Sequence, residues 1–263
     1  MPVPLRYTKM KIGPMGTVHL HRRNPWMALA CSVAMPGLGH FYCGAYLRGA
    51  ILMVWEIALN QYGRVNSAIL LSAMGHNLEA QAVVRYQWAL MYPLFYVLAM
   101  WDSYRLAADL NHVAELERRQ PRHTFHALSL TLGEVNYMGR RNPWVAAFLS
   151  LVLAGAGHLY NFQLIKALVL MGWHIAIWLN SGLNSALIAT LHGEWHAVHR
   201  LIDYQWLLFL PSIHVFNVWN AYHDAIELNN LYEEGVTHFL REVTAGARAD
   251  SDASRMPAPA DGV

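Results

Sequence analysis

Arg22-Arg23-Asn24-Pro25-Trp26 recurs as Arg140-Arg141-Asn142-Pro143-Trp144, 118 residues further along the chain. The first copy leads into Pro36-Gly37-Leu38-Gly39-His40-Phe41-Tyr42, and the second leads at the same offset into Gly155-Ala156-Gly157-His158-Leu159-Tyr160. The offset holds without a gap for these further pairs: Trp55 and Trp173, Asn66-Ser67 and Asn184-Ser185, Tyr86-Gln87-Trp88 and Tyr204-Gln205-Trp206, Trp101 and Trp219, Leu110-Asn111 and Leu228-Asn229. The sequence therefore predicts a tandem duplication of one unit.

The duplication divides the chain into five parts. An N-terminal arm (1–21) precedes the first repeat (22–111), and a polar linker (112–139) joins it to the second repeat (140–234). An amphipathic piece followed by a tail rich in Ala, Asp, Ser and Pro (235–263) ends the chain. We expect the tail to be disordered, because such a composition offers too little apolar surface for a packed core.

Apolar residues come in blocks in this chain, and charged residues are scarce. Hydrophobic residues make up 55% of the 263 and charged residues 14%, against about a quarter charged in ordinary soluble domains. The mean hydropathy of +0.20 and the abundance of Trp and Tyr favour an integral membrane protein, because amphipathic rings prefer the membrane–water boundary. A soluble helical protein with a large core is the alternative. The net charge of +2 provides no broad basic field, so nucleic acid is not an expected partner.

We expect an all-α fold, a polytopic helical membrane bundle in which each repeat has two or three spans, a broken half-helix and an interfacial amphipathic helix. Asn24 is a predicted N-cap, and Pro36-Gly37 ends the first helix after about eleven residues, or roughly 16 Å, which is half of a hydrocarbon core. Residues 68–84 are predicted to be interfacial, and residues 86–104 to form the clearest span.

Lys and Arg gather before, between and after the repeats, which the positive-inside bias places on the cytoplasmic side of the membrane. Each repeat then crosses an even number of times and both termini are cytoplasmic. Three spans per repeat would instead give an inverted pair, as in many transporters. Lipid is the expected surrounding, and other membrane proteins or a second copy are the expected partners.

The glycines of the repeated turn predict a close approach of two helices, because glycine has no side chain and tolerates positive φ. Two histidines occupy equivalent positions in this turn in both repeats. They form either a pseudo-symmetric ligand or metal pair, or caps on the carbonyls of a broken helix. The turn residues are Gly37, Gly39, His40, Gly155, Gly157 and His158.

Two pairs of ionisable residues of opposite type occupy equivalent positions in the repeats. Glu56 aligns with His174, and Arg85 aligns with Asp203. An ionisable group deep in an apolar segment is costly and is by default a functional candidate. We favour a docking role, in which each residue pairs with its counterpart across a two-fold-like axis, over a proton relay through the same residues.

The densest group of histidines is His192, His196 and His199. Their spacings of four and three place the imidazoles on one face of a helix, which suits a metal ion. The first repeat lacks histidine at these positions, so we favour a solvated or membrane-surface face, and no other cofactor is expected.

The stretch from Pro36 through Gly44, Tyr46-Leu47-Arg48-Gly49 and Trp55-Glu56 to Trp101-Asp102-Ser103-Tyr104-Arg105 resembles uncharacterised tandem-repeat membrane proteins of spore-forming Gram-positive bacteria. It is more loosely similar to TM2-domain proteins and to the N-terminal extension of sugar-transporter permeases. The resemblance implies a location in the bacterial cytoplasmic membrane and no established activity.

Nucleotide-binding glycine loops, a nucleophile elbow and Cys-x-x-Cys are absent from the sequence, which argues against soluble-type catalysis. We therefore expect a non-enzymatic, multi-pass membrane protein that acts as an assembly or interaction subunit. A small transporter or channel with Glu56 and His174 in its pathway is the first alternative. A metal-dependent membrane enzyme that uses the His192 group is the second.

Overall fold

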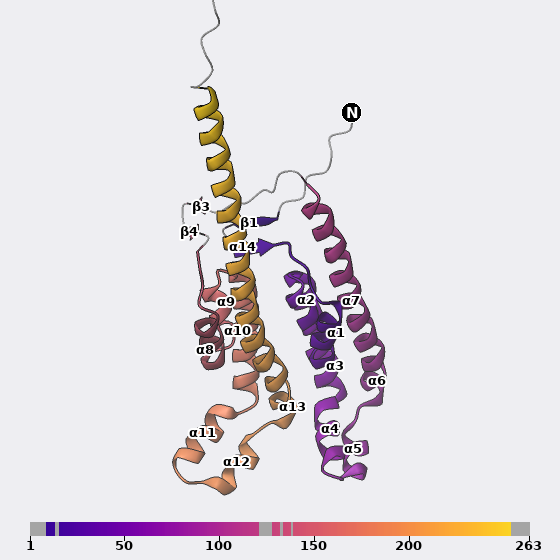
Figure 1. Cartoon of the computed structure of the whole chain (residues 1–263). Helices are drawn as coiled ribbons and strands as arrows, with labels where there is room; N and C mark the ends of the chain where they lie inside the picture. The colour runs from indigo at the N-terminus through magenta and orange to yellow at the C-terminus, as the bar shows by residue number, and fades with distance from the viewer. Residues whose placement is uncertain (1–8, 14–15, 121–127, 132–133, 138, 254–263) are drawn as a thin grey trace, which may run out of the picture.

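The computed structural model describes residues 9–13, 16–120, 128–131, 134–137 and 139–253, and these are mostly helical (Figure 1). The first half contains α1 (Pro25–Ala34), α2 (Leu38–Tyr42), α3 (Tyr46–Gly63), α4 (Val65–Ala73), α5 (Asn77–Val83), α6 (Tyr86–Ala89) and α7 (Met91–Arg118). The second half contains α8 (Pro143–Val152), α9 (Ala156–Tyr160), α10 (Leu164–Asn180), α11 (Leu183–Leu191), α12 (Trp195–Leu201), α13 (Tyr204–Leu207) and α14 (Leu210–Ala253). The all-α class is confirmed in this coarse sense.

The helices α8 to α13 begin 118 residues after α1 to α6, so the offset seen in the sequence also separates the elements. The predicted break in the first helix is present: α1 ends at Ala34, and Gly37, with φ of 102°, precedes α2. Gly155, with φ of 94°, occupies the same place between α8 and α9. The second break forms without the proline, so the glycine at positive φ is the feature that the two turns share.

An asparagine late in each half fixes the start of the first helix of that half. The amide of Asn111 on α7 accepts from the backbone N–H of Arg23 and donates to its carbonyl, both at 2.7 Å. Asn229 on α14 makes the same two bonds to Arg141, again at 2.7 Å. The side chain of Asn24 caps α1 through the Trp26 N–H at 3.0 Å, as predicted.

The structure also contains two short antiparallel hairpins, which the prediction of a purely helical chain did not include. β1 (Met10–Gly13) pairs with β2 (Gly16–His19), and β3 (Leu128–Thr131) pairs with β4 (Glu134–Tyr137). The hairpins are also 118 residues apart, so the repeated arrangement begins in the segments that the sequence analysis treats as an arm and a linker.

The last helix is longer than the sequence predicts. α14 continues without a break to Ala253, well into the region for which composition predicts disorder, and it extends beyond the rest of the bundle (Figure 1). Only residues 254–263 of the expected tail lie outside the described residues.

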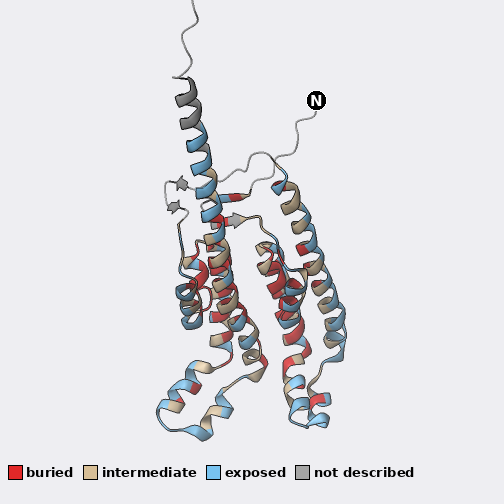
Figure 2. Ribbon diagram, viewed as in Figure 1, coloured by how far each residue is buried: buried red, intermediate tan, exposed pale blue. Residues whose placement is uncertain are grey.

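The two halves lie side by side and share one hydrophobic core (Figure 2). The fully buried members of this core come from both halves: Cys31, Met35, Leu38, Phe41, Met53, Ile57, Leu170, Ile177, Phe209, Ile213 and Phe216. Because neither half closes this cluster alone, the halves depend on each other for burial.

Among the described residues, no single helix is both long and apolar enough to cross a membrane. The clear span expected over 86–104 is divided between α6 and α7, and Pro93 falls in the first turn of α7, where proline is tolerated. One bent pair passes the test of length and composition together, namely α10 with α11, which meet at 58°.

The helix crossing at the turn gives a direct test of packing. A Cβ at Gly157 would overlap the Ala146 carbonyl oxygen and the Ser150 hydroxyl, whereas a Cβ at Gly172, inside α10, meets nothing within 4 Å. We expect Gly157→Ala to lower the free energy of unfolding by about 1–3 kcal/mol through overpacking. Gly172→Ala should leave it unchanged or raise it by up to about 1 kcal/mol. Denaturant titration of both variants checks this, and equal effects would contradict the close approach.

Candidate functional site

The interior of the second half holds a cluster of charged groups. Lys166 on α10 donates to Asp224 on α14 at 2.6 Å, and the Nδ1 atom of His158 lies 3.5 Å from the same carboxylate. The guanidinium of Arg23, from the first half, lies 4.0 Å from Asp224. All four side chains are buried. Burial alone would raise the pKa of Asp224, but Lys166, His158 and Arg23 together hold that pKa well below its usual range.

The first half contains the same combination of a histidine, a cation and an acid, but this cluster is more exposed to solvent. His40 Nε2 lies 3.0 Å from Asp102, and Arg48 donates to Asp102 at 3.2 Å. The Asp102 side chain is 24% exposed and that of Arg48 is 52% exposed. In the second half Asn220 stands where Asp102 would align, and the acid lies one helical turn further on, at Asp224.

These contacts show what the two equivalent histidines, His40 and His158, bind in the structure. His40 and His158 are both fully buried and contact carboxylates of their own halves. Within the described residues their rings neither bond to each other nor cap helix carbonyls, and the ligand or metal pair stays a prediction. Their equivalent positions reflect a repeated contact with an acid.

The N-terminal arm crosses onto the second half. The backbone N–H of Thr17 donates to the Phe162 carbonyl at 2.8 Å, and Met10 packs on Leu231 of α14. The arm thereby covers the end of the charged cluster and places its own histidines there.

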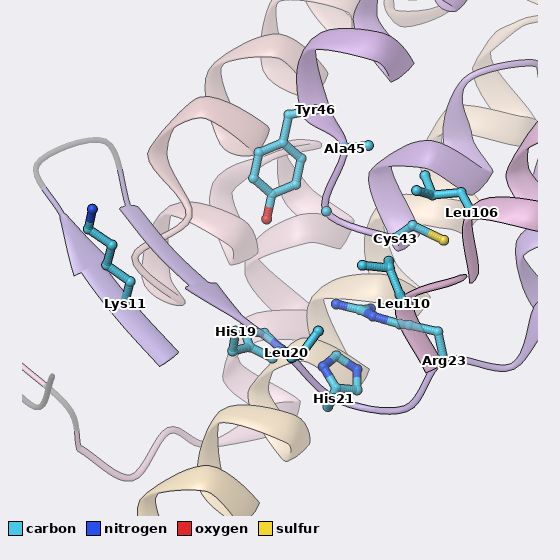
Figure 3. A pocket seen from close by; sticks show the side chains of 11 residues that line it. Lys11, His19, Leu20, His21, Arg23, Cys43, Ala45, Tyr46, Leu106 and Leu110 are labelled. Carbon is cyan, nitrogen blue, oxygen red and sulfur yellow. The ribbon is translucent and has the colours of Figure 1, made fainter. Parts of the chain in front are cut away.

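A cavity of about 280 Å³ lies beneath the arm (Figure 3). It is lined by Lys11, His19, Leu20, His21, Arg23, Cys43, Gly44, Ala45, Tyr46, Leu106 and Leu110. Among the described residues, the lining includes two cations and two imidazoles and no carboxylate. We refer to it below as the basic cavity.

The imidazoles of His19 and His21 stack with their centroids 4.6 Å apart. Burial, followed by the positive charge of Arg23, lowers the pKa of His19 to about 3 and that of His21 to about 2, so both rings are neutral near pH 7. His21 Nε2 lies 3.5 Å from Glu227 on α14. Both ring nitrogens of His19 and the Nδ1 atom of His21 are buried without a hydrogen-bond partner among the described residues.

A second polar group joins the two halves at Gln205 of α13. Its Oε1 atom accepts from the N–H and the hydroxyl of Ser67 at 2.8 and 2.9 Å. Its Nε2 atom donates to the carbonyl and the side-chain oxygen of Asn60 at 3.0 and 2.7 Å. Asn66 donates to the Gln205 backbone carbonyl at 3.0 Å. Every hydrogen-bonding group of this buried amide is engaged across the interface.

The predicted docking pairs are not the contacts that join the halves. Glu56 accepts from Tyr92 at 2.5 Å and from Asn60 at 3.4 Å, all within the first half. His174 packs on the rings of His214 and Trp178 in the second half instead.

The second predicted pair is also absent among the described side chains. Arg85 and Asp203 are both exposed, and each precedes the short helix of its own half. The Asp203 carboxylate caps α13 through the Gln205 N–H at 2.8 Å. The equivalent positions of these two pairs therefore do not face each other.

The three histidines of the predicted metal face do not share a helix. Gly193, with φ of 77°, separates His192 at the end of α11 from His196 and His199 on α12. His199 contacts the Tyr204 hydroxyl at 3.0 Å. No group of three potential metal ligands occurs in the part of the chain that the structure describes. The single-face geometry expected from spacing is wrong because the glycine breaks the helix.

Sequence reasoning missed Gln205 and the Lys166–Asp224 pair as interior contacts. The alignment of the repeats contained a signal for this pair. Lys166 aligns with Arg48, and Asn220 replaces the acid Asp102 while a new acid, Asp224, follows four residues later.

In comparisons with known proteins, the chain matches no family model, no curated protein and no solved structure.

The interface at Gln205 can be tested against its repeat counterpart, Gln87, which is exposed. Gln205→Ala removes four hydrogen bonds to Asn60 and Ser67 across the interface, and we expect it to lower the free energy of unfolding by about 2–4 kcal/mol. Gln87→Ala should change it by less than about 0.5 kcal/mol. Thermal or denaturant unfolding measures both. Equal losses would show that the interface is not made at Gln205.

Proposed function

We propose that the chain is a non-enzymatic, multi-pass protein of the bacterial cytoplasmic membrane, built from two tandem copies of one helical unit. Its role is that of an assembly or interaction subunit, with its termini on the cytoplasmic side. The proposal combines the repeated sequence, the apolar composition and the distribution of side chains described next.

The distribution of polar and apolar side chains is the observation that carries the membrane proposal. Several charged and amide side chains, including those of Lys166, Asp224 and Gln205, lie buried inside the bundle, whereas many large apolar side chains are exposed along its helices. The outward-facing set on the long helices includes Ile51, Val54, Leu94, Val97, Leu98, Leu168, Ile175, Leu179 and Val215. In water such a surface would be a large aggregation-prone patch, and in lipid it is the favoured arrangement.

The bent pair α10–α11 and the half-helices α1 and α8 are consistent with this setting. Broken helices are tolerated at membrane depth when their free backbone groups are buried in protein. The Ser150 hydroxyl, which accepts from the Gly157 N–H at 3.1 Å, meets that condition at the second break.

An interaction role is favoured by the extension of α14. Val236, Phe239, Leu240 and Val243 are exposed there at spacings of three and four, which forms one apolar stripe on a helix. A stripe of this kind is suited to pack against another helix. The extension lies at the end of the molecule that carries the hairpins, away from the α4–α5 and α11–α12 segments (Figure 1).

The transporter alternative receives less support from the contacts. Glu56, its central residue, is buried, and its Oε1 atom is engaged by Tyr92 and Asn60. His174 makes ring contacts within its own half and none with Glu56 among the described residues. These surroundings favour a structural role for both side chains.

Substitutions at two exposed apolar residues test the membrane location and the interaction role separately. Ile175→Lys, in the bent pair, should reduce stable membrane insertion, because a lysine near the middle of a span costs about 3 kcal/mol. Leu240→Lys, on the α14 stripe, should leave insertion unchanged and reduce cross-linked complexes. Carbonate-resistant membrane fractions and chemical cross-linking in intact membranes measure the two effects.

Each of the two expected results can be contradicted by the same measurement. If Ile175→Lys remains fully carbonate-resistant, the bent pair is not in contact with the hydrocarbon core. If Leu240→Lys keeps all cross-linked species, the α14 stripe is not an interaction surface.

A further inference from the structure

The basic cavity gathers hydrogen-bond donors from three different segments of the first half. The Arg23 guanidinium and the Tyr46 hydroxyl point toward the stacked rings of His19 and His21, while Lys11 on β1 lies at the rim with its ammonium directed away from them (Figure 3). The arm, the start of α1 and the start of α3 thus meet at one place. Such a set of donors is suited to a group with several acceptor oxygens.

The charges near the cavity leave it with a positive surplus. Asp224, the acid nearest to Arg23, is engaged at 2.6 Å by Lys166 and lies 4.0 Å from the guanidinium. Glu227 lies 3.5 Å from His21. An anion in the cavity would lie closer to Arg23 than Asp224 does at 4.0 Å.

The unpartnered imidazole nitrogens are a second, independent observation. Both nitrogens of His19 and the Nδ1 atom of His21 are buried with no hydrogen bond from the described residues. A buried polar atom without a partner costs about 1–3 kcal/mol, so three of them in one lining indicate a place for a polar ligand.

The opposite wall of the cavity is apolar and leads toward a second hollow. Leu106, Leu110 and Cys43 form this wall (Figure 3). Tyr42, the neighbour of Cys43, carries Arg23 over its ring at 4.9 Å and contacts the ring of Trp219 at 5.7 Å.

Trp219 belongs to an apolar cleft of about 440 Å³ between α1, α2 and α14. The cleft is lined by Met27, Ala30, Cys31, Ala34, Leu38, Pro211, Ser212, Val215, Phe216 and Trp219. Tyr42 therefore has the basic cavity on one side and the apolar cleft on the other.

We propose that the basic cavity binds the phosphate of an anionic phospholipid, and that one acyl chain of the same lipid lies in the apolar cleft between α1 and α14. The phosphate accepts from the Arg23 guanidinium and from the one N–H of the neutral His19 ring, Lys11 adds positive charge at the rim, and the chain is buried against apolar side chains. The choice of a lipid over a free phosphate rests on the proposed membrane location.

The position of the cavity along the bundle agrees with a headgroup. It lies at the N-terminal start of α1 and α3, beside the repeated Arg22-Arg23 pair, and the separate apolar cleft lies further along α1, from Met27 to Ala34. Basic pockets at this depth between helices are a recurrent mode of recognising anionic lipid headgroups. A bound lipid would also hold the two halves together, since the cleft has a wall from each.

The test uses the full-length protein purified in a zwitterionic detergent, with retention in the membrane measured separately by carbonate extraction. Short-chain phosphatidylglycerol, short-chain phosphatidylcholine and inorganic phosphate are added in turn, and binding is followed by native mass spectrometry and by thermal stabilisation. We expect phosphatidylglycerol to bind and to stabilise, and the other two to bind at least roughly tenfold more weakly.

Variants locate the site. Arg23→Gln should weaken phosphatidylglycerol binding by roughly tenfold, as expected for the loss of one charge-assisted contact. Lys11→Gln should weaken it by a smaller factor of about two to three, because it removes an exposed charge at the rim that salt screens. Lys11 is exposed, so its variant remains informative if Arg23→Gln fails to fold. Arg141→Gln is the matched control: it is the repeat counterpart of Arg23, and its guanidinium stacks on Phe162 at 4.2 Å, outside the basic cavity.

Four results would overturn the inference. They are equal binding of phosphatidylcholine, equal or tighter binding of inorganic phosphate, equal weakening by Arg141→Gln, and no binding of phosphatidylglycerol. If carbonate extraction nevertheless retains the protein in membranes, only the lipid site fails and the membrane proposal stands. If the protein is extracted by carbonate, the proposed location itself fails.

Discussion

Buried polar groups in this protein have to find their partners inside the bundle. Lys166 and Asp224, and Gln205 and Asn60, meet this demand through direct contacts at hydrogen-bond distance. A buried ion pair contributes little net stability, but the loss of one partner is expensive. The interior polar groups therefore restrict the ways in which the two halves can pack.

The repeated unit determines where the helices begin and turn, and the differences between the two copies determine which polar groups are buried and which join the halves. Helix starts, glycine turns and asparagine contacts recur at the same offset. The acid that faces the histidine and the cation is half-open at Asp102 and fully enclosed at Asp224. Gln205 is buried at the interface while its counterpart Gln87 is exposed. Divergence has thus placed the enclosed charged cluster of the second half near the arm of the first, and the docking glutamine on α13 against α3 and α4.

Local features were predictable from the sequence because they depend on neighbouring residues. The N-cap at Asn24 and the break at Gly37 follow from the preferences of these residue types. The hairpins and the length of α14 were not predictable in the same way. Short strands in a polar segment carry little periodic signal, and the Ala-rich composition of the last segment suits a helix as well as a disordered tail.

The candidate site was predictable only in part, since its members are far apart along the chain. The alignment of the repeats identified His158 but paired Glu56 with His174, because aligned positions were assumed to face each other across an axis. The halves pack without that symmetry, so Gln205 meets Asn60 and Ser67 rather than its own counterpart. Local breaks have the same effect, as Gly193 shows for the histidine group.

Photolabelling with a lipid-borne carbene tests the central claim, that this chain turns its apolar side chains toward lipid and its polar side chains inward. Mapped adducts should lie on outward-facing residues such as Val97, Leu168 and Leu179, and should be absent from the buried Met53 and Ile177. Adducts spread over both sets, or a chain that remains a compact monomer in water without detergent and takes up no label, would contradict the account.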